Sequence, residues 1–175
     1  MSIKQLNATY VLDEDRVQFR FTTANLEEYR LWLTRVGVAQ ILAYGRQTLV
    51  STLKEVHAPA QAQMIAEFKQ QAVAQTTNFK DNFEGGKSFP LQENFVLALR
   101  AQVVKEGNLH NIGFSLANRQ TLNLRLTEDL LSKLCALLQK IEQAARWGLD
   151  EPELVSVQRA TLQELPTTNQ PNVLH

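Results

Sequence analysis

The sequence is poor in the residue types that most often form cross-links and metal sites. Its 175 residues include one cysteine, Cys135, so no disulfide can form within the chain, and a reducing compartment fits this composition. The three histidines, His57, His110 and His175, stand far apart, and no two of them have the spacing of metal ligands. The sequence therefore predicts no metal site.

An excess of charge of one sign is also missing. Lys and Arg total 18, and Asp and Glu total 18, so the formal net charge is zero. Proteins dedicated to nucleic acid usually carry a basic excess, because phosphate contacts dominate their affinity. No stretch approaches the roughly 18 apolar residues of a membrane helix, and the first residues lack the apolar region of a secretory signal. We expect a cytoplasmic protein with no membrane partner, for which nucleic acid is not the favoured ligand.

Motifs for catalysis or nucleotide binding are equally scarce. Residues 85–88, GGKS, resemble the end of a phosphate-binding loop, but Asp81 stands where that loop needs its first glycine. Cys135 falls on the apolar side of a predicted helix, where a buried and unreactive thiol is expected. Many carboxylates gather at predicted turns, where we expect them to be solvated: Asp13, Glu14, Asp15, Glu27 and Glu28. The sequence predicts no enzymatic activity and no cofactor.

A repeat is what the sequence does contain. At an offset of 93 residues, without a gap, ten positions between Leu6 and Gln47 carry the same residue as their counterparts. FTTAN at 21–25 matches FSLAN at 114–118, and LWLT at 31–34 matches LRLT at 124–127. The alternation of apolar and polar residues also keeps its phase through both copies. The sequence therefore predicts an internal duplication.

Each copy predicts three strands, because apolar and polar residues alternate with a period of two. The apolar positions of the first copy are Leu6, Ala8, Tyr10, Val17, Phe19, Phe21, Tyr29, Leu31 and Leu33. Those of the second copy are Leu97, Leu99, Ala101, Val103, His110, Ile112, Phe114, Leu116, Leu122, Leu124 and Leu126. His110 shares this apolar phase, so we expect it to be partly buried with its polar atoms satisfied.

A helix follows the strands in each copy. Thr34 and Thr127 stand at the predicted N-caps, where a hydroxyl can accept a free backbone N–H. The first helix has apolar positions at Val38, Ile41, Leu42, Gly45, Leu49 and Leu53. The second has them at Leu130, Leu131, Leu134, Cys135, Leu138 and Ile141, and Gly148 is its predicted C-cap. Pro59 begins a further helix between the copies, with Met64, Phe68, Ala72 and Phe79 at near-helical spacing.

The predicted fold class is α+β, a duplicated βββα–(α)–βββα chain. Antiparallel meander sheets carry helices packed on one face, and the two copies are related by a pseudo-twofold axis. Residues 1–149 form a single duplicated domain, with repeat one at 3–56, an inter-repeat helix and loop at 57–92 and repeat two at 93–149. Residues 150–175 form a C-terminal extension that we expect to be partly flexible.

The polar side of the predicted strands is the candidate interaction surface. Its members are Arg16, Gln18, Arg20, Arg30 and Trp32 in the first copy, Arg125 in the second, and the nearby Arg35. Trp32 among arginines can stack on nucleic-acid bases; alternatively it packs against another subunit, the tail or an arginine stem. Arg35 follows the Thr34 cap, where a cation opposes the helix dipole. We expect one of three arrangements for Arg35: it contacts an anionic partner, it pairs with Glu27 or Glu28, or it points into solvent.

The duplicated βββα pattern resembles the Whirly and PUR-repeat families of single-strand nucleic-acid-binding proteins, which use four strands per repeat where this sequence predicts three. That resemblance implies nucleic-acid binding through the Arg/Trp sheet face. The absence of catalytic motifs, the zero net charge and the edge strands that need covering favour a protein-interaction or scaffold module instead, with a second copy in a homodimer or another protein as its partner. An enzyme with an unfamiliar site is the least favoured of the three hypotheses.

Overall fold

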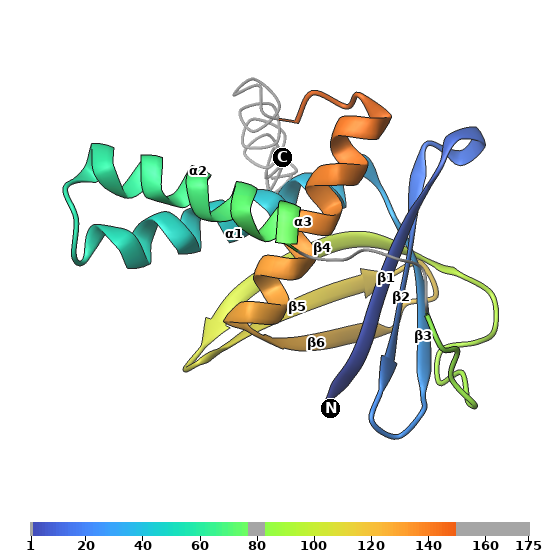
Figure 1. Ribbon diagram of the computed structural model, residues 1–175. Coiled ribbons are helices and arrows are strands. Elements are labelled where there is room, and N and C mark those ends of the chain that lie inside the picture. Colours follow the sequence, from blue (N-terminus) through green and yellow to red (C-terminus); the bar gives the residue numbers. More distant parts are fainter. Residues whose placement is uncertain (1, 77–82, 150–175) are drawn as a thin grey trace, which may run out of the picture.

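The computed structural model describes residues 2–76 and 83–149, which form an α+β domain with one mostly antiparallel sheet (Figure 1). The strands are β1 (Ile3–Val11), β2 (Arg16–Thr23), β3 (Glu28–Leu33), β4 (Val96–Glu106), β5 (Leu109–Leu116) and β6 (Thr121–Thr127). The helices are α1 (Arg35–Lys54), α2 (Pro59–Thr76) and α3 (Glu128–Ala145), with a short 3-10 helix, η1 (Leu12–Glu14), after β1. The predicted C-terminal extension lies outside the described residues.

The six strands lie side by side in chain order, so the two meanders belong to one continuous sheet. All neighbours are antiparallel except β3 and β4, which pair in parallel. This parallel pairing is short and joins Leu31 to Val96, Trp32 to Leu97 and Leu33 to Ala98. A parallel pair needs a long crossover connection, and α1, α2 and the segment that follows them supply it.

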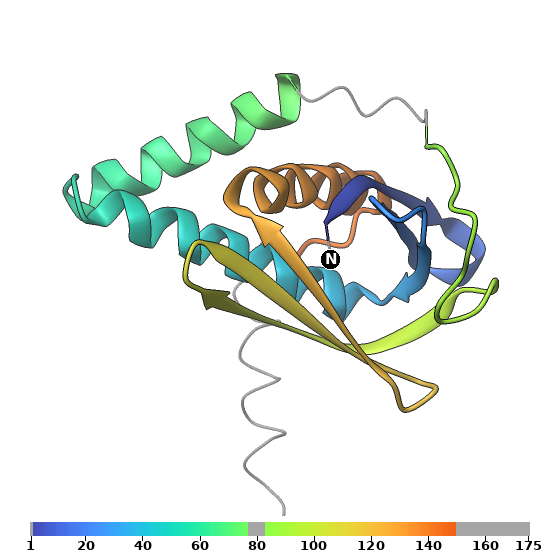
Figure 2. The same ribbon diagram turned by 90° about the horizontal axis from the view of Figure 1, so that it is seen from below.

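The sheet curves around α1 and α3, and α2 lies on their outer side (Figure 2). α1 packs mainly against β4, α3 packs against β1 and β6, and α2 packs on α1 and α3. The main core lies between the sheet and the first layer of helices. Its fully buried members include Phe19, Phe21, Leu31, Leu33, Ile41, Ile112, Phe114, Leu124, Leu126, Leu134 and Leu138. Both predicted helices on the sheet therefore cover its apolar face.

The predicted helix starts are confirmed, and one predicted helix end is wrong. The Thr34 hydroxyl accepts a hydrogen bond from the Gly37 N–H at 3.2 Å, and the Thr127 hydroxyl accepts one from the Leu130 N–H at 3.3 Å. Gly148 does not cap α3. The helix ends two residues earlier at Arg146, which adopts the left-handed conformation (φ 55°) and donates its N–H to the carbonyls of α3.

The alternation predicted for β4 is wrong in its first half. Leu99 is exposed and Leu97 is only half-buried, whereas Val96 and Ala98 are buried. The reason is a register shift between Ala98 and Arg100 in the pairing with β5. A bulge of this kind moves the following residues to the opposite side of the strand. Beyond it Ala101 and Val103 face the core as predicted.

α2 begins at Pro59 as predicted, but the helix packs through smaller residues than its spacing of large apolar residues suggests. Ala62 and Ala66 are buried against Leu53 of α1, with Leu49, Val50 and Ile65 around them, in a second small core. Met64 and Phe68 instead have 71% and 72% of their surface exposed. Phe79 lies outside the described residues. Alanines bring α1 and α2 close together, and this leaves the large side chains of α2 on its outer surface.

The two halves of the domain share local geometry at equivalent positions. β5 and β6 pair His110 with Leu126, as β2 and β3 pair Val17 with Leu33 at an offset of 93 residues. Leu26 and Arg119, which are also 93 residues apart, have positive φ angles of 60° and 66° in the turns between these strands. The strand order and the parallel junction do not by themselves supply a twofold axis, so the predicted symmetry stays a prediction.

Candidate interaction surfaces

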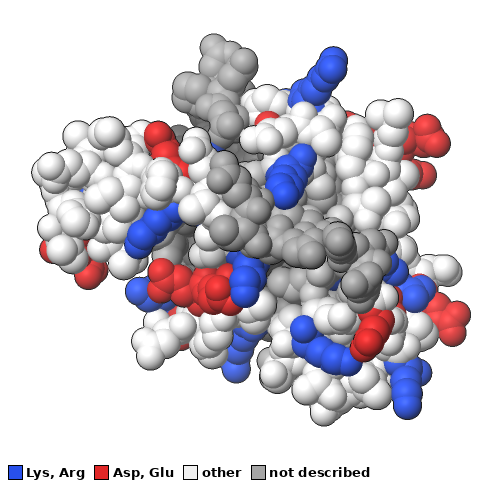
Figure 3. All heavy atoms as spheres, in the orientation of Figure 1, with Lys and Arg blue, Asp and Glu red and all other residues white. Residues whose placement is uncertain are grey.

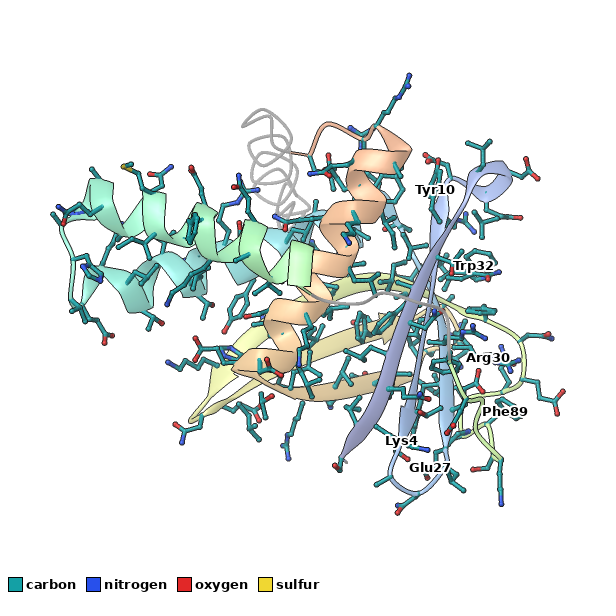
Figure 4. The ribbon with its side chains drawn as sticks, viewed as in Figure 1. Lys4, Tyr10, Glu27, Arg30, Trp32 and Phe89 are labelled. Carbon is teal, nitrogen blue, oxygen red and sulfur yellow. The ribbon has the colours of Figure 1, made fainter. Side chains whose placement is uncertain are left out.

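The outer side of β2 and β3 brings together five of the seven residues that the sequence selects. Arg16, Gln18, Arg20, Arg30 and Trp32 all lie on this side and all are half-buried. In the register of the two strands Gln18 stands opposite Trp32, and Arg20 stands opposite Arg30. Figure 4 shows Arg30 and Trp32 side by side on this surface, which we call the Arg/Trp face.

Residues 83–95, which lead from the inter-repeat region into β4, cover the Arg/Trp face. The guanidinium of Arg20 lies 4.3 Å from the centre of the Phe83 ring, and that of Arg30 lies 4.5 Å from the centre of the Phe89 ring. The Phe95 ring lies 5.3 Å from the Trp32 ring, centre to centre. Figure 4 shows Phe89 beside Arg30. The positions where bases could stack therefore already hold rings of the same chain.

A buried carboxylate, Glu28, fixes this covering segment to the sheet, so the prediction that Glu28 is solvated is wrong. Glu28 is 1% exposed; its Oε1 accepts from Arg30 Nε at 2.7 Å and its Oε2 accepts from the Gly86 N–H at 2.8 Å. Burial alone would raise the pKa of Glu28, but the hydrogen bonds from Arg30 and Gly86 outweigh it and the pKa lies below its usual value. The carboxylate is therefore charged and paired.

The GGKS sequence has a structural role at this point of the fold. A Cβ on Gly86 would lie 2.7 Å from the backbone nitrogen of Glu28 and 2.7 Å from the carbonyl oxygen of Leu26. The Lys87 N–H donates to that same Leu26 oxygen at 2.6 Å, and the Glu28 N–H donates to the Ser88 oxygen at 2.8 Å. Glycine is required because the two backbones touch here, and no feature of a phosphate-binding loop is needed to explain the motif.

The structure places the other two selected arginines elsewhere. Arg125 lies on β6 and is exposed, and its guanidinium is 3.3 Å from the Glu106 carboxylate. Arg35 pairs with neither Glu27 nor Glu28. Its guanidinium donates to the backbone oxygen of Trp147 and lies near Asp15.

That Arg35 contact belongs to a cluster joining three elements. Trp147 Nε1 and the Tyr10 hydroxyl both donate to Asp15 Oδ1, at 2.7 and 2.8 Å. The pKa of Asp15 is lowered by these bonds, first that of Trp147 and then that of Tyr10, and by the charge of Arg35. The cluster ties the residues after α3 to the β1–β2 turn and the start of α1. Arg35 is therefore explained by a contact within the chain.

A second surface lies between the helices, where α2 separates from α1 and passes over α3 (Figure 2). A groove of about 470 Å³ opens there, and we call it the helix groove. Its apolar lining includes Leu49, Phe68, Val73, Leu131, Cys135 and Ala136. An adjoining groove of about 430 Å³ shares Gln70, Ala136 and Gln139 with it, and five of its eleven lining residues are glutamines. Volumes of this size are typical of sites that take a ligand or an anchoring side chain.

Phe68 both lines the helix groove and stands out from it, and Met64 lies one turn earlier on α2. The sequence points to both residues through their helical spacing, but it does not reveal which side of α2 faces α1. The abundance of alanine in α2 is the signal that could have done so, because close helix packing selects small residues.

The rim of the helix groove carries both positive and negative side chains. Lys69 contributes from α2, and Glu128 and Asp129 contribute from the first turn of α3, where carboxylates suit the helix dipole. Asp129 pairs with Lys133 at 2.7 Å, whereas Lys69 and Glu128 form no ion pair with any of the described residues. Figure 3 shows positive and negative side chains interspersed on this face, with mostly uncharged surface over α1 and α2.

Cys135 and His110 are both buried, as predicted. The Cys135 sulfur packs against Gly45, where a Cβ would lie 2.4 Å away, and burial raises the thiol pKa to about 12. His110 is 2% exposed, and its Nδ1 lies 3.3 Å from the Tyr44 hydroxyl. Across residues 2–76 and 83–149, no three His, Cys, Asp or Glu side chains converge as metal ligands would.

Comparisons with known proteins place the chain in no family. No family model matches it, and no match to a curated protein or to a solved structure was found. The resemblance to the Whirly and PUR-repeat proteins therefore gains no support from these comparisons. Of the helices in the described residues, none has the length and apolar character needed to span a membrane.

Proposed function

We propose that the chain is a non-enzymatic protein-interaction module that binds an anchor side chain of a protein partner in the helix groove. The observation that carries this proposal is the combination of two exposed apolar side chains on α2, Met64 and Phe68, with an apolar groove that Phe68 itself lines. Large apolar side chains exposed next to a groove mark binding surfaces, because water contact is unfavourable for both.

The lining of the groove indicates what the partner must present. Seven of its side chains are apolar or a neutral thiol, so an aromatic or long aliphatic anchor fits it. At the rim, Asp129 is already paired with Lys133, whereas Glu128 forms no ion pair with the described residues. We therefore propose a partner segment that carries a large apolar residue next to a lysine or arginine, the cation taking the rim position near α3.

Peptide binding tests this proposal. A short fluorescein-labelled peptide with one Phe–Lys pair among Ser and Gly residues is titrated with the protein, and its anisotropy is measured. We expect saturable binding that falls at least about tenfold, or about 1.4 kcal/mol, when the peptide Phe becomes Ser. Replacing the peptide Lys by Glu weakens binding less, since the rim is exposed to solvent.

Protein variants show where the peptide binds. Ser132→Trp places a large ring into the groove that Ser132 lines and should abolish binding. Ser51→Trp puts the same ring on the exposed side of α1 and should leave it unchanged. Equal binding of all peptides, or equal effects of the two variants, would contradict the proposal.

We also propose that the two βββα halves arose by duplication and that the protein works in the cytoplasm, as a homodimer or with another protein. The shared strand register, the two threonine caps and the paired positive-φ turns support the duplication. Single-strand nucleic-acid binding is the alternative that we do not favour. The rings of Phe83, Phe89 and Phe95 occupy the face that it requires.

A further inference from the structure

We propose that the partner of the helix groove is a second copy of this chain, docked about a twofold axis so that Phe68 of each copy enters the groove of the other. This inference rests on the proposed function and names the occupant of the same site. It starts from the chemistry that the groove requires, which is a large apolar anchor beside a cation. Phe68 and Lys69 of α2 are such a pair of neighbouring residues, and Phe68 is 72% exposed.

The position of Phe68 is what makes the surface self-complementary. A twofold dimer uses one patch on both subunits, so the patch must carry both the protruding residue and the site that receives it. Phe68 lines the helix groove and also stands out beside it. Two copies facing each other across this point each offer a ring to the partner's groove. Met64, one turn away on α2, extends the apolar contact on both sides.

The charges on the rim are complementary in the same arrangement. Lys69 and Glu128 border one groove from opposite helices, and neither forms an ion pair with the described residues of its own chain. In a twofold dimer Lys69 of each copy approaches Glu128 of the other, which gives two equivalent ion pairs. A surface with charge of one sign would repel its own copy, whereas this rim carries both signs.

The length of α2 provides a long edge for this contact. α2 has 18 residues, which corresponds to roughly 27 Å of helix, and Met64 and Phe68 both lie on its exposed side. Aromatic anchors at the centre of such a face carry a large share of the binding energy.

The test is the molecular mass in solution, measured by sedimentation equilibrium over a concentration series. We expect the wild-type chain to reach twice its mass of 19.8 kDa. Phe68→Ser should weaken dimerisation at least about a hundredfold (about 2.7 kcal/mol) while leaving the fold intact, because Phe68 is mostly exposed. Val56→Ser removes an even more exposed side chain at the end of α1 and is the matched control, with no expected change.

A charge-swap mixture shows that the contact is between copies. Lys69→Glu alone and Glu128→Lys alone each place like charges at both rim contacts of a homodimer, so each variant should be weakened. In an equimolar mixture, a heterodimer of the two variants has opposite charges at both contacts, and dimers should reappear. An effect of either variant that comes only from its own chain would not be reversed by mixing.

The outcomes separate this inference from the proposed function. A chain that stays monomeric up to roughly 1 mM, the weak end of specific association, yet binds the Phe–Lys peptide in a Ser132-dependent way, overturns the homodimer and leaves the proposed function in place. A dimer that Phe68→Ser does not weaken overturns the inference as well. Loss of both peptide binding and Phe68-dependent dimerisation overturns both proposals.

Discussion

At the scale of single residues, the contact between Glu28 and Gly86 shows how a polar side chain of the sheet can hold a loop. Glu28 lies in the polar phase of β3, yet it is buried because residues 83–88 cover it. A buried carboxylate is costly unless its hydrogen bonds are made. Arg30 and the Gly86 N–H make them, so the position of the loop depends on a glycine that allows the backbones to touch.

We predict that Gly86→Ala lowers the free energy of unfolding by about 1–3 kcal/mol, the usual cost of overpacking a closely packed site. The new Cβ would lie 2.7 Å from backbone atoms of Leu26 and Glu28, which cannot move without disturbing β3. Urea denaturation measures the loss. Gly85→Ala is the matched control, since its Cβ would meet only the Glu28 Oε2 at 3.2 Å, and its loss should be smaller. Equal losses would mean that close approach is not the cause.

His110 gives a prediction about pH. Burial lowers its pKa, the charge of Lys105 adds to this, and Glu128 opposes it; Tyr44 is the polar group that contacts the ring. The unfolded chain therefore binds a proton at a higher pH than the folded chain does. The contribution of the neutral His110 ring to stability is fully present above the ordinary histidine pKa of about 6.5. It decreases as the pH falls below that value, and it is lost once the pH has fallen through the lowered pKa of the folded state.

The measurement is the urea midpoint between pH 7.5 and roughly 5, a range that lies above the ordinary carboxylate pKa values. His110→Gln keeps a polar group near Tyr44 and removes the titration, so its midpoint should change less with pH than that of the wild type. Parallel curves for the two proteins would show that another group is responsible.

At the scale of elements, Thr34 and Thr127 both cap their helices, although the first turns of the two helices differ in charge. Thr34 precedes Arg35, whereas Thr127 precedes Glu128 and Asp129, yet both hydroxyls accept from the N–H three residues on. We predict that Thr34→Ala and Thr127→Ala each lower the free energy of unfolding by about 1 kcal/mol. Thr34→Ser and Thr127→Ser keep the hydroxyl and should stay near the wild type in thermal denaturation. A serine variant as unstable as the alanine variant would argue against capping.

Local sequence patterns predict where the strands and helices lie, but they miss the bulge within β4 and the residue that ends α3. Alternation locates the strands, and threonine followed by a helical period locates both helix starts. The bulge after Ala98 interrupts the alternation of β4, and no glycine or proline in the strand indicates it. Arg146 ends α3 in a left-handed conformation that favours glycine. The next residue, Trp147, donates a hydrogen bond to Asp15, which lies far away in the sequence.

At the scale of the whole molecule, the sequence predicts a polar sheet face but not what covers it. The alternation of apolar and polar residues in β2 and β3 correctly predicts which residues lie on the Arg/Trp face. Its covering by Phe83, Phe89 and Phe95 depends on contacts between residues about 60 apart, which no local pattern encodes. The helix groove cannot be predicted from sequence either, because its lining combines residues of α1 and α2 with residues of α3, which is distant along the chain.

This covering leads to a prediction about nucleic acid. In Trp147→Phe protein, Trp32 is the only tryptophan, and its fluorescence reports directly on the Arg/Trp face. We expect no saturable change when single-stranded oligonucleotides are added at low salt, because Phe95 lies against Trp32 and the arginines lie against Phe83 and Phe89. Non-specific binding through phosphates should be no tighter than about 10⁻⁴ M at physiological salt, the weak end for such contacts.

The control is Phe95→Ala in the same Trp147→Phe background, which removes the ring beside Trp32 while leaving Arg20 and Arg30 in place. If covering is what blocks stacking, this variant should respond to oligonucleotides more than its parent does, and the response should fall as salt is added. A strong, salt-sensitive response already present in the parent would mean that bases reach Trp32 despite Phe95. In that case the Arg/Trp face, and not the helix groove, would be the functional surface of the protein.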